Sequence, residues 1–356
     1  MSQSPPSPTP APDPVLWSDP AREFAFNAWL SRLGAHELQS VTLRLASTDA
    51  SFRRYLRIDS TDGTRIIMDA PPAKEDSQPF VNVARLMKQA GLHVPEVLNW
   101  DEAHGFLLLT DLGDKTMMQA MVQDNPQANQ ASYLQAVDAL ITWQLASKPG
   151  VLPPYDEALL QRELALFPDW YLARHRGIAM EGEVRSALDA AFKHIVAQNL
   201  MWPSVFVHRD FMPRNLMQGS PPGILDFQDA VYGPVTYDIA SLMRDAFLTW
   251  EEDFVLDITI RYWEKARKAA LPVGDDFGEF YRGVEWMGLQ RHLKIAGIFA
   301  RLTLRDGKPQ YLADTPRFID YIRATCSRYR ELKPLLRLID RVEGIEAATG
   351  FAYGRV

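Results

Sequence analysis

The 356-residue chain has little of what several protein classes require. Cys326 is the only cysteine, so the sequence excludes an internal disulfide framework and a multi-cysteine zinc or iron–sulfur site. Basic residues are in deficit, because 38 Lys and Arg face 45 Asp and Glu and leave a net charge of −7, which disfavours nucleic acid as a partner. No stretch supplies the roughly 20 apolar residues of a membrane span. These absences indicate a protein of a reducing compartment.

The N-terminus lacks the features of a signal peptide, since residues 1–14 contain neither a basic segment nor an apolar core. Six of the 25 prolines fall there instead. We therefore expect a disordered, proline-rich tail over residues 1–19 and a cytoplasmic protein.

The composition that is present fits a globular chain, with 47% hydrophobic and 11% aromatic residues. At about 150 residues per domain the length predicts two domains or two lobes. A helical pattern over 22–33 precedes short apolar and β-branched runs that turn residues separate. These runs predict antiparallel strands at 41–46, 55–58 and 65–68, a helix at 80–90, and strands at 96–100 and 105–110.

Beyond Leu112 the pattern is mostly helical, and strand-like runs occur only at 204–207 and around 216 and 224–225. Helices are predicted over 133–145, 157–174, 183–198, 237–248, 253–269, 277–304 and 316–341. The sequence thus predicts an α+β fold with a small sheet-rich N-lobe, residues 20–111, and a larger helical C-lobe, residues 112–356. The chemistry is expected in a cleft near residues 111–114.

One stretch carries a chemical motif. His208, Asp210 and Asn215 have the His-x-Asp-x-x-x-x-Asn spacing of a phosphotransferase catalytic loop, and Asp226 follows 11 residues later. Taken singly, an aspartate after a strand is an ordinary turn or cap residue, but these residues share one spacing. Asp210 fits the group that accepts the proton of the attacking hydroxyl, and Asn215 and Asp226 fit oxygen ligands of Mg²⁺.

Two further residues are expected to support this loop structurally. His208 is interpreted as a buried histidine that bonds backbone near the metal site. Asp238 is expected to cap the following helix and to brace the loop.

The motif resembles that of the aminoglycoside phosphotransferase and choline kinase family, whose fold is similar to that of protein kinases. The resemblance implies ATP and Mg²⁺ as cofactors and a nucleotide-binding N-lobe. It also implies that the run Leu107-Leu108-Leu109-Thr110-Asp111-Leu112-Gly113 is the hinge between the lobes. Backbone groups near Thr110 and Leu112 would then bind the adenine edge.

Four softer stretches resemble the bacterial cell-wall amino-sugar kinases, which act on N-acetylmuramate and N-acetylglucosamine. They are Asp49-Ala50-Ser51-Phe52-Arg53-Arg54-Tyr55, Met68-Asp69-Ala70-Pro71-Pro72, Phe167-Pro168-Asp169-Trp170-Tyr171 and Gln290-Arg291-His292-Leu293-Lys294. This resemblance implies transfer of a phosphoryl group to the anomeric C1 hydroxyl. The product would be a sugar 1-phosphate of peptidoglycan recycling.

The sequence departs from its relatives at the phosphate grip. The hairpin position has no glycine, so phosphate contacts are expected from backbone N–H groups and from the hydroxyls of Ser47, Thr48 and Ser51. The third strand carries Met68 or Asp69 where a lysine is usual. Arg53 or Arg54 could supply the missing cation, Lys74 is a weaker candidate, and the two arginines equally fit a solvated strand face.

The acceptor pocket is the least readable part of the sequence. A nearby cation would favour the carboxylate of N-acetylmuramate, and the candidates form two clusters that also fit ordinary exposed helix faces. The clusters are Arg174, His175 and Arg176, and Arg291, His292 and Lys294.

Two other functions remain open at this stage. The first is a kinase of the same fold with another hydroxyl acceptor, such as an aminoglycoside, choline or homoserine. The second is a catalytically silent, nucleotide-binding pseudokinase. The sequence leaves oligomeric state and the preference between the two amino sugars undecided.

Overall fold

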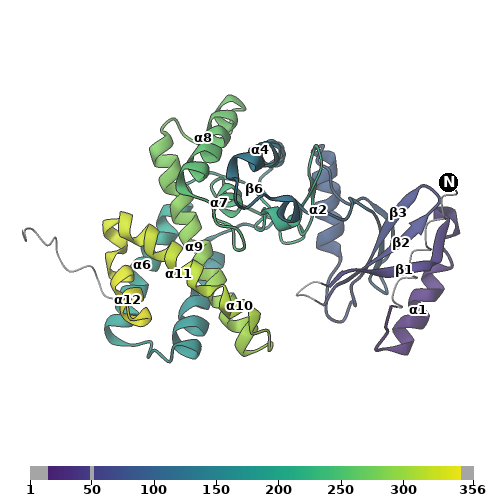
Figure 1. Ribbon diagram of the computed structural model, residues 1–356, viewed down its shortest axis with the longest axis horizontal. Coiled ribbons are helices and arrows are strands. Elements are labelled where there is room, and N and C mark those ends of the chain that lie inside the picture. Colours follow the sequence, from purple (N-terminus) through teal and green to yellow (C-terminus); the bar gives the residue numbers. More distant parts are fainter. Residues whose placement is uncertain (1–14, 49–51, 346–356) are drawn as a thin grey trace, which may run out of the picture. The chain divides into compact units, whose positions relative to one another are not determined.

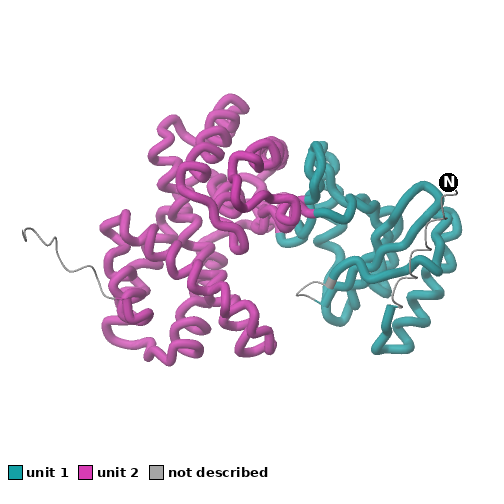
Figure 2. The backbone as a smooth tube through the Cα atoms, in the orientation of Figure 1, with its two compact units in different colours: residues 1–115, 217–229 teal, residues 116–216, 230–356 magenta. Residues whose placement is uncertain are grey.

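The computed structural model describes residues 15–48 and 52–345, and the chain divides into two compact units (Figure 2). Unit 1 comprises Met1–Lys115 and Met217–Asp229, and unit 2 comprises Thr116–Leu216 and Ala230–Val356. The division differs from the expected boundary at 111/112, because the segment that carries Asp226 belongs to unit 1. Ile224 N donates to the His93 carbonyl at 2.8 Å, and the rings of Phe80 and Phe227 stack at 4.9 Å.

Unit 1 is built on a five-stranded antiparallel sheet of order β1-β2-β3-β5-β4 (Figure 1). Its strands are β1 (Leu38–Thr48), β2 (Arg54–Ser60), β3 (Gly63–Asp69), β4 (Val97–Asp101) and β5 (Phe106–Thr110). Gly63, with φ of 128°, closes the tight turn between β2 and β3 in a conformation that a side chain would strain. All five predicted strands are confirmed, with ends shifted by a few residues.

Helix α1 (Pro20–Leu30) covers one face of this sheet. Asp19 caps it by accepting N–H bonds from Ala21 and Arg22. Phe26 and Trp29 of the helix pack on alternate residues of β2, including Leu56 and Ile58. The same core extends before the helix, because Trp17 packs on Phe26 with ring centroids 4.8 Å apart. The predicted tail of residues 1–19 is therefore wrong for residues 15–19, whereas residues 1–14 lie outside the described part.

Unit 2 is mainly helical, and α9 (Phe277–Leu304) runs through its centre with the bounds that the sequence predicts. The helix is buried on nearly all sides from Phe280 to Ala300. Gly297 permits the close crossing of α5, since a Cβ there would lie 2.4 Å from the Leu166 backbone. Buried helices of this kind read as apolar all round, and the few charged residues in them need partners.

The other elements complete the two units. Unit 1 also contains η1 (Gly34–His36), α2 (Gln78–Gln89) and β8 (Gly223–Ile224), which pairs with β7 (Leu216–Met217). Unit 2 contains α3 (Met117–Ala120), η2 (Pro126–Asn129), α4 (Gln130–Leu145), α5 (Glu157–Leu166), η3 (Phe167–His175), α6 (Gly182–Leu200), β6 (Ser204–Val207), η4 (Pro213–Asn215), β9 (Val231–Pro234), α7 (Tyr237–Met243), α8 (Glu252–Lys268), α10 (Gln310–Ala313), α11 (Thr315–Arg328), η5 (Arg330–Leu332) and α12 (Lys333–Glu343).

Three helix predictions need correction. The predicted helix 157–174 widens into the π-helix η3 at Phe167, and the predicted helix 316–341 breaks into α11 and α12 around Tyr329, whose backbone is extended. The predicted helix 237–248 stops at Met243, because the Asp245 carboxylate accepts the N–H groups of Phe247 and Leu248 and turns the chain. In the described part of the chain, no helix is both long and apolar enough to cross a bilayer.

Candidate active site

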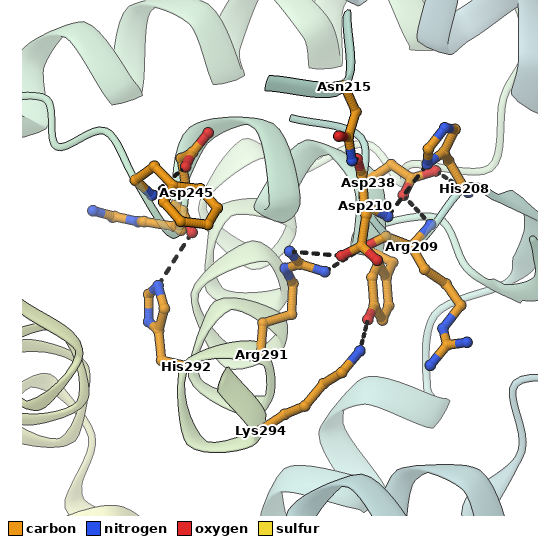
Figure 3. Close-up of polar contacts among 12 residues, drawn as sticks. His208, Arg209, Asp210, Asn215, Asp238, Asp245, Arg291, His292 and Lys294 are labelled. Atoms are coloured by element: carbon orange, nitrogen blue, oxygen red, sulfur yellow. Dashed lines mark hydrogen bonds and ion pairs between the residues drawn. The ribbon is translucent and has the colours of Figure 1, made fainter. Parts of the chain in front are cut away.

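The catalytic-motif loop, residues 208–215, follows β6 in unit 2 and is held by Asp238 of α7. The Asp238 carboxylate accepts the backbone N–H of His208 at 2.6 Å and that of Arg209 at 3.0 Å (Figure 3). Arg209 has a φ of 79°, a left-handed conformation that costs a non-glycine residue energy and needs such support. Asp238 therefore fixes the start of the loop, and burial raises the pKa of its carboxyl to about 7.

The rest of the loop positions Asp210. The buried His208 ring accepts the backbone N–H of Asp210 through Nδ1 at 3.3 Å, and Asn215 donates its side-chain Nδ2 to the Asp210 carbonyl at 3.0 Å. Both bonds hold the backbone and leave the carboxylate to other groups. The Asp210 side chain is 40% exposed, so it can reach a bound substrate.

Two cations of α9 lie under the loop. Figure 3 shows Arg291 pointing toward Asp210, and Lys294 Nζ lies 3.5 Å from the Tyr237 hydroxyl. The Arg291 side chain is only 1% exposed, donates to the carbonyl of Arg209, and places Nη2 3.7 Å from Asp210 Oδ1. Its guanidinium also lies 5.0 Å from the centre of the Tyr237 ring. Lys294 Nζ lies 3.1 Å from Glu163 Oε1.

Glu163 of α5 completes this buried network. It accepts a bond from Arg209 at 2.5 Å and one from the Tyr155 hydroxyl at 2.5 Å, in addition to its contact with Lys294. Sequence reasoning missed Glu163, because it lies far along the chain from its partners. The only local signal is that the motif places a basic residue, Arg209, inside the loop.

The cations set the charge state of the carboxylates. Burial alone would raise the pKa of Asp210, but the charges of Lys294, Arg291 and Arg209 outweigh it and hold that pKa below its ordinary value. The pKa of Glu163 is lowered in the same way, since Lys294 and Arg209 offset its burial. Asp210 is therefore ionised at neutral pH and can orient a hydroxyl and accept its proton.

The contacts of His292 disfavour the acceptor role that the sequence predicts for it. Its ring is buried, Nε2 lies 3.2 Å from the Arg244 carbonyl, and the ring stacks on Tyr321 at 4.6 Å. Burial lowers its pKa to about 3, so the imidazole is neutral. Arg291 and Lys294 are not on an exposed helix face either.

The other predicted acceptor cluster lies on η3. The Arg174 guanidinium stacks over the Trp170 ring at 3.9 Å, and the His175 ring packs on Tyr171 at 5.4 Å. Arg176 is committed to an ion pair with Glu343. These contacts lie within η3 or join it to α12, and Arg174 remains an exposed cation.

In unit 1 the predicted cation Arg54 has structural partners. Pairing of β2 with β3 puts Arg54 opposite Asp69, on the face of the sheet that α1 covers. Arg54 Nη2 lies 2.7 Å from Asp69 Oδ2, Arg22 of α1 binds the same carboxylate, and the Arg54 guanidinium lies 4.0 Å from the Trp17 ring. This placement disfavours the predicted phosphate contact of Arg54. Asp69, not a lysine, ends the third strand.

The remaining nucleotide candidates stand near the ends of strands. Ser47 and Thr48 end β1, Arg53 precedes β2, and Ser51 lies outside the described residues. At the predicted hinge, Thr110 N donates to the Glu96 carbonyl at 3.1 Å, so this N–H is engaged within unit 1.

Between these two hinge residues, Asp111 is held by Arg57 at 2.6 Å and Thr64 at 2.7 Å. Burial alone would raise the pKa of Asp111, but the bonds from Arg57 and Thr64 outweigh burial and hold that pKa below its ordinary value. The hinge is therefore tied to strands β2 and β3.

The two predicted metal ligands belong to different units, Asn215 to unit 2 and Asp226 to unit 1. Asp226 follows β8 with a φ of 62°, and Gln228 Nε2 donates to its Oδ1 at 2.9 Å. Among the residues in the two described ranges, no group of three His, Cys, Asp or Glu side chains could hold a metal ion. An amide oxygen and a carboxylate nevertheless fit Mg²⁺, which takes few protein ligands and several from phosphate and water.

The fold and the loop define a class of protein. Residues 42–274 match the phosphotransferase enzyme family, and the chain belongs to that family. Solved structures agree: the aminoglycoside phosphotransferase APH(2'')-Ib is 13% identical, with a TM-score of 0.57 over 85% of this chain and 97% of that one. Plasmodium vivax ethanolamine kinase is 10% identical, with a TM-score of 0.56 over 85% and 84%. These likenesses confirm the predicted α+β, kinase-like fold.

Curated relatives are more specific. An N-acetylmuramate/N-acetylglucosamine kinase of Pseudomonas aeruginosa is 48% identical over 93% of this chain and 100% of its own length. Kinases of the same name from Neisseria meningitidis and Caulobacter vibrioides are 46% and 30% identical, over 93% and 91% of this chain and 99% and 98% of their own. The predicted resemblance to the amino-sugar kinases is confirmed.

Proposed function

We propose that this protein is an ATP-dependent kinase of N-acetylmuramate and N-acetylglucosamine. The observation that carries the proposal is similarity over nearly the full chain, at up to 48% identity, to relatives with that name. The catalytic loop adds the chemistry: an exposed, ionised aspartate on a backbone that several buried groups fix. The acceptor atom would be the anomeric C1 oxygen, and the product a sugar 1-phosphate of peptidoglycan recycling.

The proposed reaction is direct in-line transfer. Asp210 accepts a hydrogen bond from the C1 hydroxyl, orients its oxygen toward the γ-phosphate and takes its proton as the new O–P bond forms. The bond between the γ-phosphorus and the bridging oxygen breaks in the same step, and ADP leaves. An anomeric hydroxyl is more acidic than an ordinary alcohol, so a carboxylate of low pKa suffices as base. Arg291 and Lys294 keep that carboxylate ionised and placed, and neither needs to touch the sugar.

The residues of the metal and nucleotide sites are assigned from the chemistry of their donor atoms and from the spacing of the motif. Mg²⁺, when bound with ATP, neutralises phosphate charge. Asn215 and Asp226 would hold it, and backbone near Thr110 and Leu112 would bind adenine. Ser47, Thr48, Ser51 and Arg53 would contact phosphate. Localisation in the cytoplasm is part of the same proposal, since ATP is available there.

An acceptor panel in a coupled ADP-release assay tests the proposal. With ATP and Mg²⁺, the two amino sugars should give turnover, whereas choline, ethanolamine, homoserine and an aminoglycoside should give none above background. Turnover with a cationic alcohol but with neither sugar would reject the acceptor and keep the kinase. ATP binding in a thermal-shift titration without ADP release on any acceptor would instead indicate a pseudokinase.

A further inference from the structure

The cations around the catalytic loop differ in whether they already form an ion pair with a carboxylate. Arg209 and Lys294 both bind Glu163, and Arg291 is buried against Asp210. Arg214 is the exception within the loop. Its side chain is exposed, and across residues 15–48 and 52–345 its guanidinium forms neither an ion pair nor a hydrogen bond.

Arg214 is close to the reacting groups along the chain of the loop. It lies four residues after Asp210 and directly before Asn215, in the turn η4, which the bond from Asn215 N to the Met212 carbonyl closes at 2.9 Å. Arg214 and Arg291 both lower the pKa of the buried Asp245. The charges of both guanidinium groups therefore act on one buried carboxylate.

The Arg214 guanidinium packs on an aromatic ring. It lies 4.5 Å from the centre of the Phe247 ring. Phe247 in turn is fixed by the bond from its backbone N–H to Asp245, and the neighbouring carbonyl of Ala246 accepts a bond from Arg317 at 3.2 Å. Stacking occupies the flat face of a guanidinium and leaves its in-plane N–H donors for a ligand, an arrangement that suits bidentate binding of a carboxylate.

We infer that Arg214 binds the carboxylate of the acceptor and so favours N-acetylmuramate over N-acetylglucosamine. The inference rests on the proposed function. The two sugars differ by a lactyl ether, whose carboxylate is repelled by Asp210 and by the phosphates of ATP. Bringing such an acceptor to Asp210 therefore needs a local cation, and Arg214 is the loop cation whose donors are not engaged.

Arg174 is the rival for this role, because it too is exposed and stacked on an aromatic ring without an ion pair in the described part of unit 2. It lies on η3, outside the loop. The experiment therefore compares wild type, Arg214→Met, Arg214→Lys and Arg174→Met, with both sugars at saturating ATP and Mg²⁺. Methionine keeps an apolar contact with Phe247, and thermal melting checks that each variant is folded.

Arg214→Met should lower kcat/KM for N-acetylmuramate by about 10- to 100-fold, mainly through KM, since a charge-assisted hydrogen bond is lost. For N-acetylglucosamine it should change by less than about threefold, because that sugar has no carboxylate. Arg214→Lys should fall between, since it keeps the charge and loses the planar fork. The methyl ester of N-acetylmuramate should show no difference between wild type and Arg214→Met.

Three results would overturn the inference. Equal losses on both sugars would assign Arg214 to the phosphates or to the base. Loss of the preference in Arg174→Met, with Arg214→Met unaffected, would move the carboxylate site to η3. If wild type turned over neither sugar, the proposed function would be rejected and this inference with it, whereas the first two results leave the proposed function standing.

Discussion

Each unit contains a carboxylate with several arginine or lysine neighbours, but the two units bury opposite partners. In unit 1 the Asp69 side chain is 5% exposed, and Arg54, its partner, is 24% exposed. In unit 2 the order is reversed, since Arg291 is 1% exposed and Asp210 is 40% exposed. Both pairs join an arginine to an aspartate. Solvent or a substrate can reach the arginine in unit 1 and the aspartate in unit 2.

This difference separates a structural ion pair from a reactive one. A buried carboxylate that arginines enclose cross-links α1 and β2 to β3 and has no oxygen to offer a substrate. A buried cation under an exposed carboxylate fixes that group in its ionised form and leaves its oxygens accessible. The comparison therefore predicts that removing the acid abolishes activity in unit 2 and lowers stability in unit 1.

The largest effect is expected for Asp210→Asn. The amide cannot accept the proton of the attacking hydroxyl, so kcat should fall by about 10²- to 10⁴-fold, while KM for ATP changes little. Steady-state kinetics on both amino sugars measure this, and circular dichroism confirms the fold. Activity within tenfold of wild type would show that Asp210 is not the base.

Asp69→Asn should do the reverse. Removing the buried charge leaves Arg22 and Arg54 unpaired and should lower the free energy of unfolding by about 2 to 4 kcal/mol. The kcat of the folded enzyme should stay within about threefold, because both oxygens of Asp69 bind arginines of the same unit. Chemical denaturation and kinetics check both. A loss of kcat without a loss of stability would contradict the comparison.

Two variants serve as controls for Asp69. Asp62→Asn removes an exposed acid of the turn between β2 and β3, which pairs with Arg65, and should leave the melting temperature almost unchanged. Arg54→Met should destabilise less than Asp69→Asn, since Arg22 still binds Asp69, and should leave KM for ATP unchanged. A tenfold rise in that KM would assign Arg54 to phosphate binding after all.

The sequence predicts local elements well where one period dominates. The five strands of unit 1 and the bounds of α9 follow from alternating or helical apolar patterns, and the catalytic loop follows from fixed spacing. Helix ends that depend on side-chain hydrogen bonds are not predicted, as with the end of α7 before Asp245. The proline-rich composition before Trp17 also wrongly predicts that Trp17 belongs to a disordered tail. Its fixed position comes from packing on Phe26 rather than from local propensity.

Burial of charge is what the sequence predicts least. The run Arg291-His292-Leu293-Lys294 looks like an exposed cationic face, because the groups that neutralise it are far along the chain. Glu163 and Asp210 are those groups, and only the folded unit brings them to α9. In the same way, the pairing that occupies Arg54 depends on the register of β2 and β3.

The smallest effect concerns pH and extends the comparison to a buried titratable group of unit 2. Burial lowers the pKa of His292 to about 3 in the folded protein, whereas an unfolded histidine titrates near 6.5. Below about pH 6.5, His292 binds a proton in the unfolded chain but not in the folded chain. The contribution of neutral His292 to stability is therefore present above that pH and is lost as the pH falls.

His292→Phe keeps the ring stack on Tyr321 and removes the titration. Between pH 7.5 and pH 5, wild type should lose about 1 to 2 kcal/mol more unfolding free energy than His292→Phe does. Asp238 and Asp245, whose raised pKa values of about 7 and about 6 act in the opposite direction, are common to both proteins and cancel in the difference. Denaturation curves at the two pH values measure it. Equal losses in the two proteins would mean that His292 takes up a proton in the folded state. The His292 ring would then be more accessible to water than its contacts with Arg244 and Tyr321 indicate.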